Sequence, residues 1–410
     1  MDKNKRLTVW LPVIIAASIA LGIFIGNHYL SISQGKKRSY SSGNKINAIL
    51  DIIDEQYVDT VSMSKLVEST IPKIFSELDP HSVYIPAEDA SVVNEELEGS
   101  FSGIGVSFNM QTDTILVISV ISGGPAEKAG LLPFDRIISI NDSIFSGKKK
   151  NQGEIMKTLR GAKNSTVKLG VQRGNSPELL YFDVTRGDVP VNSVDVSYEA
   201  AKGIGYIKVS KFARNTYNEF ITAIAKLKQA GCTSFVIDLR GNTGGYMDAA
   251  INMINEFMPE GRLIVYTEGK SFPRSDVYAN GTGTCKDAPI VVLTDEISAS
   301  ASEIFSGAIQ DNDRGTIIGR RTYGKGLVQT QMSLSDGSEM RLTIARYYTP
   351  SGRCIQKKYE MGNTDAYDQD IYNRYMHGEF DSADSIKMDD SLKYQTVGGR
   401  TVYGGGGIMP

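Results

Sequence analysis

The second half of this sequence repeats one pattern, in which a short apolar run is followed by a helical segment. G-I-G-Y-I-K-V-S (203–210), S-F-V-I-D-L-R (234–240) and P-I-V-V-L-T-D (289–295) are typical of strands, and helices are expected at 215–230, 248–257 and 300–310. The middle run is apolar enough for burial on both faces. The pattern predicts an α/β core of layered strands and helices over residues 188–355.

A shorter β-rich segment precedes this core. Between Gly99 and Gly187, strand-like runs alternate with Gly, Pro, Asn and Asp, which predicts a small separate domain over 99–187. In S-G-I-G-V-S-F (102–108), Gly103 and Gly105 allow backbone N–H groups to converge before a strand. Such a nest can hold a carboxylate while the strand edge pairs with an extended peptide. An ordinary tight turn is the alternative interpretation.

A second motif in this segment is G-G-P-A-E-K-A-G-L (123–131), a turn and short helix that lead into D-R-I-I-S-I-N-D. Together the two motifs resemble a PDZ domain, whose peptide ligands dock by their C-terminal carboxylate. The resemblance implies that Gly103, Ile104, Gly105 and Val106 bind the carboxylate and the end of the peptide.

The N-terminal segment, residues 1–30, is expected to target a membrane. Residues 9–26 carry no charge and follow Lys3, Lys5 and Arg6. Because no small-x-small cleavage pattern closes the run cleanly, a single retained transmembrane helix is favoured over a cleaved signal. The body is then expected outside the cytoplasm, on the periplasmic face of a bacterial inner membrane, although basic residues at 36–38 weaken the charge asymmetry.

Residues 31–98 form a linker and an N-terminal helical region. Ile46, Ile49, Leu50 and Ile53 recur at helical spacing, and a second helix is expected at 63–77. The region continues into L-D-P-H-S-V-Y-I-P (78–86), where two prolines and the Asp-Pro step predict a turn or an extended connection. His81 in this motif is most simply a hydrogen-bonded loop histidine.

Composition narrows the chemistry. With 44 Lys and Arg against 47 Asp and Glu, the net charge of −3 argues against nucleic acid as a partner. The three cysteines are widely spaced without a C-x-x-C, so neither a disulfide framework nor a zinc site is supported, and no metal or cofactor is expected. Three cysteines do not exclude a single disulfide. Only three histidines are present, which disfavours a histidine-based catalytic triad.

The third strand-to-helix junction carries E-I-S-A-S-A-S-E-I-F (296–305). A serine here would lie at a helix N-terminus, where N–H groups and the helix dipole favour negative charge, so it suits a nucleophile. Ser300 and Glu303 also have the spacing of a helix capping box, which is the structural alternative. Ser298 and Ser302 are further candidates, because sequence alone does not say which hydroxyl faces a cleft.

A nucleophilic serine needs a base, and among the histidines only His81 is placed to approach. The next suitable base is a desolvated lysine, as in Ser-Lys enzymes. T-Y-G-K-G-L-V-Q (322–329) supplies Lys325 between two glycines, with Gln329 four residues later. A solvated surface lysine is the alternative.

These motifs, with D-L-R-G-N-T-G-G upstream and L-D-P-H-S-x-Y near the start, resemble the carboxyl-terminal processing (tail-specific) serine protease family over residues 44–355. The resemblance implies a ClpP/crotonase-like core and the following site: Ser300 as nucleophile, Lys325 as general base, Gln329 orienting the lysine, and an oxyanion hole from Ala301 with Gly244 or Gly245. It also implies that the PDZ domain recognises the free C-terminus of a substrate and gates the active site. We hypothesise that the substrates are exported proteins and that no ATP or metal is needed. A homo-oligomer or an adaptor protein is a further candidate partner.

Residues 356–410 form a polar segment that stops in a glycine-rich stretch, which suggests an incomplete C-terminal region. Two alternative functions stay open. A membrane-tethered PDZ scaffold on an inactive core would keep the 103–106 loop without needing Ser300. A nucleotide-binding enzyme would need a phosphate motif, and G-x-x-G-G without a neighbouring Lys-Ser/Thr pair is a weak one.

Overall fold

The computed structural model describes residues 16–23, 42–111, 114–144 and 152–410. The chain forms two units, Met1–Thr70 and Ile71–Pro410, each of which is described by itself. In the first unit, residues 16–23 are helical, α2 spans Ser42–Gln56, and α3 (Met63–Ser76) begins before the division between the units. Helix α2 contains the residues whose apolar spacing predicted a helix, and α3 lies at the second helix expected over 63–77. In α2, Ile46 and Ile49 are exposed, while Leu50 and Ile53 are partly buried.

The predicted transmembrane helix is wrong. Of the predicted span, the structure describes residues 16–23, which are helical. Within the described part of the chain, no helix is both long enough and apolar enough to span a membrane. The remainder of residues 9–26 lies outside the described residues.

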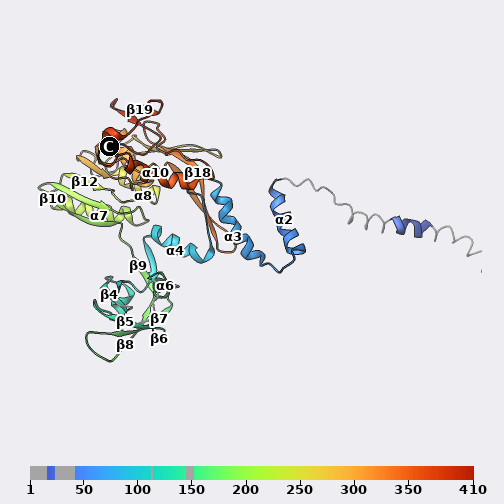
Figure 1. Cartoon of the computed structure of the whole chain (residues 1–410). Helices are drawn as coiled ribbons and strands as arrows, with labels where there is room; N and C mark the ends of the chain where they lie inside the picture. The colour runs from blue at the N-terminus through green and yellow to red at the C-terminus, as the bar shows by residue number, and fades with distance from the viewer. Residues whose placement is uncertain (1–15, 24–41, 112–113, 145–151) are drawn as a thin grey trace, which may run out of the picture. The chain divides into compact units, whose positions relative to one another are not determined.

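The β-rich segment forms an antiparallel sheet in the order β3-β4-β5-β7-β8, with β6 beside β5 (Figure 1). Two helices, α5 (Pro125–Ala129) and α6 (Gln152–Leu159), accompany the sheet. Alternate strand residues such as Val117, Ile137 and Val167 are fully buried in one core. The strands are β3 (Val106–Gln111), β4 (Thr114–Val120), β5 (Arg136–Ile140), β6 (Ser143–Ile144), β7 (Thr166–Gln172) and β8 (Leu180–Thr185).

A two-stranded ribbon leads into and out of this sheet. Strand β2 (Ser100–Gly103) follows α4 (Ala87–Glu98) and pairs antiparallel with β9 (Gly187–Pro190), which ends the segment. The chain therefore enters and leaves at adjacent positions, which is the geometry of an inserted domain.

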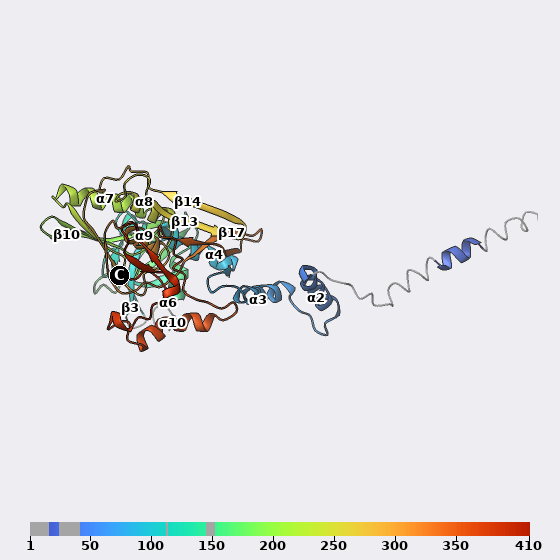
Figure 2. The same cartoon turned by 90° about the horizontal axis from the view of Figure 1, so that it is seen from above.

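The main core contains a five-stranded sheet in the order β10-β11-β12-β15-β16, in which all pairs except β10–β11 are parallel. Its helices are α7 (Thr216–Gln229), α8 (Met247–Asn255) and α9 (Ala301–Asp311) (Figure 2). In α7, which lies at the predicted helix 215–230, Phe220, Ile224 and Leu227 form a buried face. The strands are β10 (Val194–Ala201), β11 (Ile204–Val209), β12 (Ser234–Asp238), β15 (Ile290–Thr294) and β16 (Thr316–Gly319).

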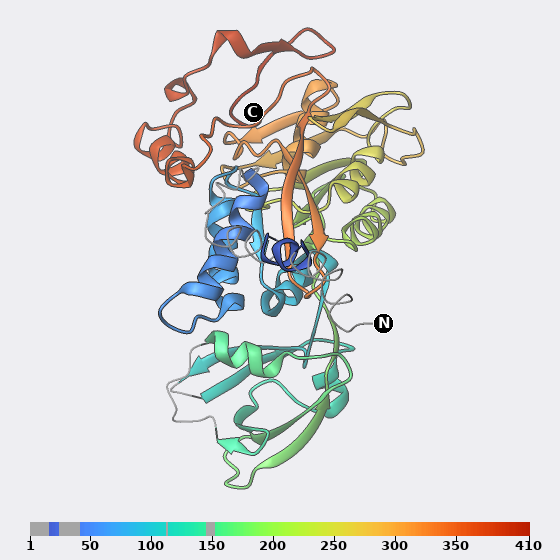
Figure 3. The same cartoon turned by 90° about the vertical axis from the view of Figure 1, so that its right-hand side faces the viewer.

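A second sheet completes the core and was not foreseen from the sequence. Its order is β1-β18-β13-β14, and β17 pairs with β18 in a long hairpin, orange in Figure 3. Its strands are β1 (Val83–Ile85), β13 (Leu263–Gly269), β14 (Phe272–Tyr278), β17 (Leu327–Ser333) and β18 (Glu339–Tyr348). Because β1 pairs with β18, the L-D-P-H-S motif that precedes β1 lies beside the hairpin.

The C-terminal segment contains α10 (Thr364–Met376), two short 3-10 helices (Ala383–Ser385 and Asp390–Leu392), and a pair of strands, β19 (Lys393–Gln395) and β20 (Thr401–Tyr403). The glycine-rich stretch that follows is part of the main core. Ile408 is fully buried in the core cluster, and its backbone exchanges hydrogen bonds with Thr322. The segment therefore holds the loop that leads to Lys325.

Candidate active site

Ser300 lies at the turn between β15 and α9. Its backbone adopts φ 54° and ψ −113°, a conformation that a non-glycine residue occupies at a cost of about 1–3 kcal/mol. The Ser300 N–H donates to the Glu303 carboxylate at 2.8 Å, which is one half of the predicted capping box. Ser300 can cap the helix and also line a cleft, because the Glu303 carboxylate binds the backbone N–H of Ser300.

The other two candidate serines are held inside the core. Ser298 and Ser302 are fully buried, and their hydroxyls donate to the backbone carbonyls of Leu239 at 2.8 Å and Asn242 at 2.9 Å. Ser300, in contrast, lines a cleft of about 780 Å³. Of the three serines, Ser300 has the position that a nucleophile requires.

The same cleft contains the predicted base. It is lined by Gly244, Gly245, Tyr246, Ser300, Lys325, Gln329, Arg341 and Tyr347, among others. The Lys325 Nζ donates to Gln329 Oε1 at 3.1 Å. Burial, followed by the positive charge of Arg341, lowers the pKa of Lys325, while Glu303 and Asp79 oppose the shift. A larger fraction of this amine is therefore neutral at a given pH than for a solvated lysine.

Glu303 connects the serine and lysine segments, a role that the sequence analysis missed. Its carboxylate is fully buried and accepts the Thr322 hydroxyl at 2.5 Å and the N–H groups of Gly324 and Lys325 at 2.7 and 2.9 Å, besides that of Ser300. Burial raises the pKa of Glu303, and these donors counteract the rise. The only sequence signal was the capping spacing, which predicts one of the four contacts.

The loop that carries Gly244 and Gly245 packs directly against Ser300. A Cβ atom added to Gly244 would lie 2.8 Å from Ser300 Cβ and 3.0 Å from Ala301 N. Gly244 N–H donates to Asn242 Oδ1 at 2.8 Å. The N–H groups of Gly245 and Ala301 have no acceptor among the described residues. Of the two glycines, Gly245 is therefore the one with an N–H available to a ligand.

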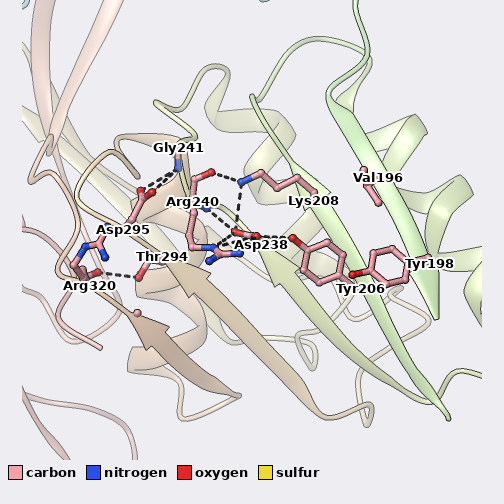
Figure 4. Close-up of a pocket in the computed structure, with 11 residues that line it drawn as sticks. Val196, Tyr198, Tyr206, Lys208, Asp238, Arg240, Gly241, Thr294, Asp295 and Arg320 are labelled. Atoms are coloured by element: carbon pink, nitrogen blue, oxygen red, sulfur yellow. Dashed lines mark hydrogen bonds and ion pairs between the residues drawn. The ribbon is translucent and has the colours of Figure 1, made fainter. Parts of the chain in front are cut away.

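Asp238 and Arg240 lie at the start of this loop and line a neighbouring pocket of about 720 Å³ (Figure 4). Tyr206, Lys208 and Arg240 are directed at the buried Asp238 carboxylate. Burial would raise the pKa of Asp238, but hydrogen bonds from Arg240 and Tyr206 outweigh it and give a pKa of about 2. The ionised carboxylate fixes Arg240, from which the loop continues to the two glycines.

His81 lies close to the cleft without lining it. Its Nε2 is 2.9 Å from the Tyr367 hydroxyl, and its carbonyl accepts the Gln329 Nε2. Burial, followed by the positive charge of Lys325, lowers the pKa of His81 to about 4. The histidine is neutral near pH 7 and is bonded as the sequence analysis expected of a loop residue.

The 103–106 loop joins the ribbon strand β2 to the edge strand β3. Gly105 has φ 78°, and the carbonyls of Ile104 and Gly105 accept the N–H groups of Ala126 and Ile121. The N–H groups of Ile104 and Gly105 have no acceptor within the described part of the chain. Strand β3 pairs only with β4 there, so the loop and one strand edge are open to a peptide.

An α/β core with a serine at a helix N-terminus, a desolvated lysine in the same cleft, and an inserted antiparallel domain together define a PDZ-containing serine protease. Family models agree: Peptidase family S41 matches residues 203–365 and the PDZ domain matches residues 102–195. The chain belongs to this family of carboxy-terminal processing serine proteases, which confirms the resemblance and the enzyme class inferred from the sequence.

Two relatives support this assignment. The carboxy-terminal processing protease CtpB of Bacillus subtilis (strain 168) is 35% identical over 318 residues, which cover 77% of this chain and 66% of that protein. A probable CtpA-like serine protease of Staphylococcus aureus (strain N315) is 33% identical over 365 residues, covering 87% and 72%. Among solved structures, a photosystem II D1 C-terminal processing protease matches with a TM-score of 0.42 and 28% identity, covering 76% of this chain and 90% of that one.

Proposed function

We propose that this protein is an endopeptidase that cleaves proteins near their C-termini with a Ser300–Lys325 dyad. The observation that carries the proposal is that Ser300, in a strained turn at a helix N-terminus, lines the same cleft as a desolvated lysine bonded to Gln329. The buried, internally bonded hydroxyls of Ser298 and Ser302 support this choice of nucleophile.

The reaction follows Ser-Lys chemistry. Neutral Lys325 Nζ takes the proton of Ser300 Oγ while Oγ forms a bond to the scissile carbonyl carbon. The resulting oxyanion accepts the N–H groups of Ala301 and Gly245, at the positive end of α9. When the C–N bond breaks, the leaving amine takes the proton from Lys325. In deacylation Lys325 takes a proton from water as the water oxygen bonds to the acyl carbon, and it returns the proton to Ser300 Oγ when the C–O bond to the serine breaks.

The PDZ domain supplies substrate selection in this proposal. A substrate's C-terminal carboxylate accepts the free N–H groups of Ile104 and Gly105, and its last residues pair with the open edge of β3. A fluorescent peptide with a free C-terminus is expected to bind more tightly than its C-terminal amide. Equal affinity of the two peptides would refute recognition of the carboxylate.

The test of the chemistry is cleavage of an unfolded protein with an apolar C-terminal tail by the full chain, compared with Ser300→Ala and Lys325→Ala. Both variants are expected to lose turnover while they keep the wild-type circular dichroism spectrum and peptide binding. Full activity in Ser300→Ala would refute Ser300 as the nucleophile. An inactive wild type that still binds free C-termini would support a peptide-binding scaffold instead.

A further inference from the structure

The loop that carries Asp79 and His81, just before β1, approaches the catalytic cleft from the first strand of the second sheet. It contains the L-D-P-H-S motif, and it lies beside β18 because Val83 pairs with Arg341. On the other side of β18, Gln329 of β17 pairs with Thr343 at a bulge in the register. The loop and Gln329 therefore meet across one strand.

Asp79 organises the loop and attaches it to β18. Its Oδ1 accepts the N–H groups of His81 at 3.0 Å and Ser82 at 3.1 Å, and the Thr343 hydroxyl at 2.9 Å. Its Oδ2 accepts the Ser82 hydroxyl at 2.5 Å, and the Ser82 Oγ accepts the Thr343 N–H at 3.0 Å. Four hydrogen bonds to one carboxylate leave the backbone at His81 little freedom.

The position of the His81 carbonyl decides which way the Gln329 carboxamide faces. A carbonyl oxygen only accepts, and the amide nitrogen of glutamine only donates, so the Gln329 Nε2 must face His81 O. The Gln329 Oε1 then faces Lys325 Nζ at 3.1 Å and accepts one of its hydrogens. A neutral amine held in this way keeps its lone pair directed away from Gln329.

We infer that the Asp79–Ser82 turn is a positioning element for the catalytic base, which acts by holding the His81 carbonyl against Gln329. This inference rests on the proposed Ser-Lys function and assigns a role to a motif remote in sequence from Ser300 and Lys325. The group that contacts Gln329 is the His81 backbone carbonyl, since the imidazole is hydrogen-bonded to the Tyr367 hydroxyl. Asp79 touches neither substrate nor reacting atoms in this arrangement.

A double-mutant cycle tests the inference, with kcat and KM measured for tail cleavage by the full chain. Asp79→Ala is expected to lower kcat about 10²-fold, the usual order for a misplaced catalytic group, with KM within about twofold of wild type. In a Gln329→Ala background, the same substitution is expected to lower kcat no further, because its effect passes through Gln329. Equal losses in both backgrounds would refute the inference and indicate a general structural role.

Two further variants separate positioning from folding. Asp79→Asn is expected to recover most of kcat, because an asparagine Oδ1 can accept the three bonds that Asp79 Oδ1 accepts. Asp336→Ala is the matched control, since Asp336 accepts the Ser338 N–H and hydroxyl in a similar turn at the β17–β18 hairpin, and it is expected to keep kcat. Failure of Asn to restore kcat in a folded protein would contradict the inference.

Cleavage by Ser300→Ala in the same experiment separates the two proposals. If Ser300→Ala and Lys325→Ala are inactive but Asp79→Ala is fully active, the positioning inference fails and the dyad stands. If Ser300→Ala remains active, the proposed function fails whatever the Asp79 variants do.

Discussion

Substitution of Gly244 by alanine should lower kcat in a protein that still folds. Gly244 has φ +105°, where an alanine is strained by about 1–2 kcal/mol. Its Cβ would lie 2.8 Å from both Ala299 O and Ser300 Cβ, about 0.6 Å inside the 3.4 Å at which ordinary contacts begin. Because these atoms belong to the serine turn, relief of the contact must move Ser300, Ala301 or the glycine loop.

The expected result is a loss in kcat of about 10²-fold, because displacement of a catalytic group by about 1 Å has this effect and loss of one oxyanion donor costs about 10² to 10³. Gly231→Ala is the matched control. Gly231 has φ +96° with no atom within 4 Å of an added Cβ, and it follows α7 outside the cleft. This variant should carry the conformational strain without the contact. The strain is expected to lower its melting temperature, while kcat stays at the wild-type value.

The assay is tail cleavage under saturating substrate, with thermal unfolding of both variants. If Gly244→Ala retained wild-type kcat, the glycine loop would not support the serine turn, and the oxyanion assignment that depends on this packing would be refuted. If Gly231→Ala lost as much kcat as Gly244→Ala, strain rather than the contact with Ser300 would explain the loss.

Three further predictions address the lysine, the C-terminal stretch and the serines. Activity should fall as acid protonates Lys325, and Arg341→Gln should move this limb of the kcat/KM profile to higher pH, because Arg341 lowers the pKa of Lys325; an unmoved limb would contradict the electrostatic argument. Gly407→Ala, with φ +87° and a Cβ 2.6 Å from Thr322 O, should lower stability by about 1–3 kcal/mol in chemical denaturation and also lower kcat, since Thr322 binds Glu303; unchanged turnover would remove the C-terminal stretch from the site. Ser302→Ala leaves the Asn242 carbonyl without this donor and should reduce the free energy of unfolding by about 1–3 kcal/mol with catalysis retained, so an inactive but folded variant would reopen the assignment of the nucleophile.

The strands and helices that the sequence indicated in the main core are those with strong local signals. Strands β11, β12 and β15 coincide with the three apolar runs, and α7 lies within the predicted helix 215–230. The second sheet escaped notice because its strands are amphipathic or polar and pair over long sequence separations. Strand β14 is mostly exposed, and β1 has three residues that pair with β18 more than 250 positions later.

The N-terminal segment shows the opposite error. An uncharged run preceded by basic residues has the composition of a membrane helix, but no helix in the described part of the chain is long and apolar enough to span a membrane.

Sequence by itself determined the residue types on which this chemistry depends: a serine at a strand-to-helix turn and a lysine between glycines with a glutamine four residues later. The scarcity of histidine also disfavoured a histidine-based triad. Tertiary structure decided which of the three alternate serines at 298, 300 and 302 faces the cleft, and that Lys325 is desolvated. It also decided that Glu303 binds the backbone of both Ser300 and Lys325. The physical reason is that burial, hydrogen-bond partners and pKa depend on groups far apart in the chain, such as His81 and Gln329, which only folding brings into contact.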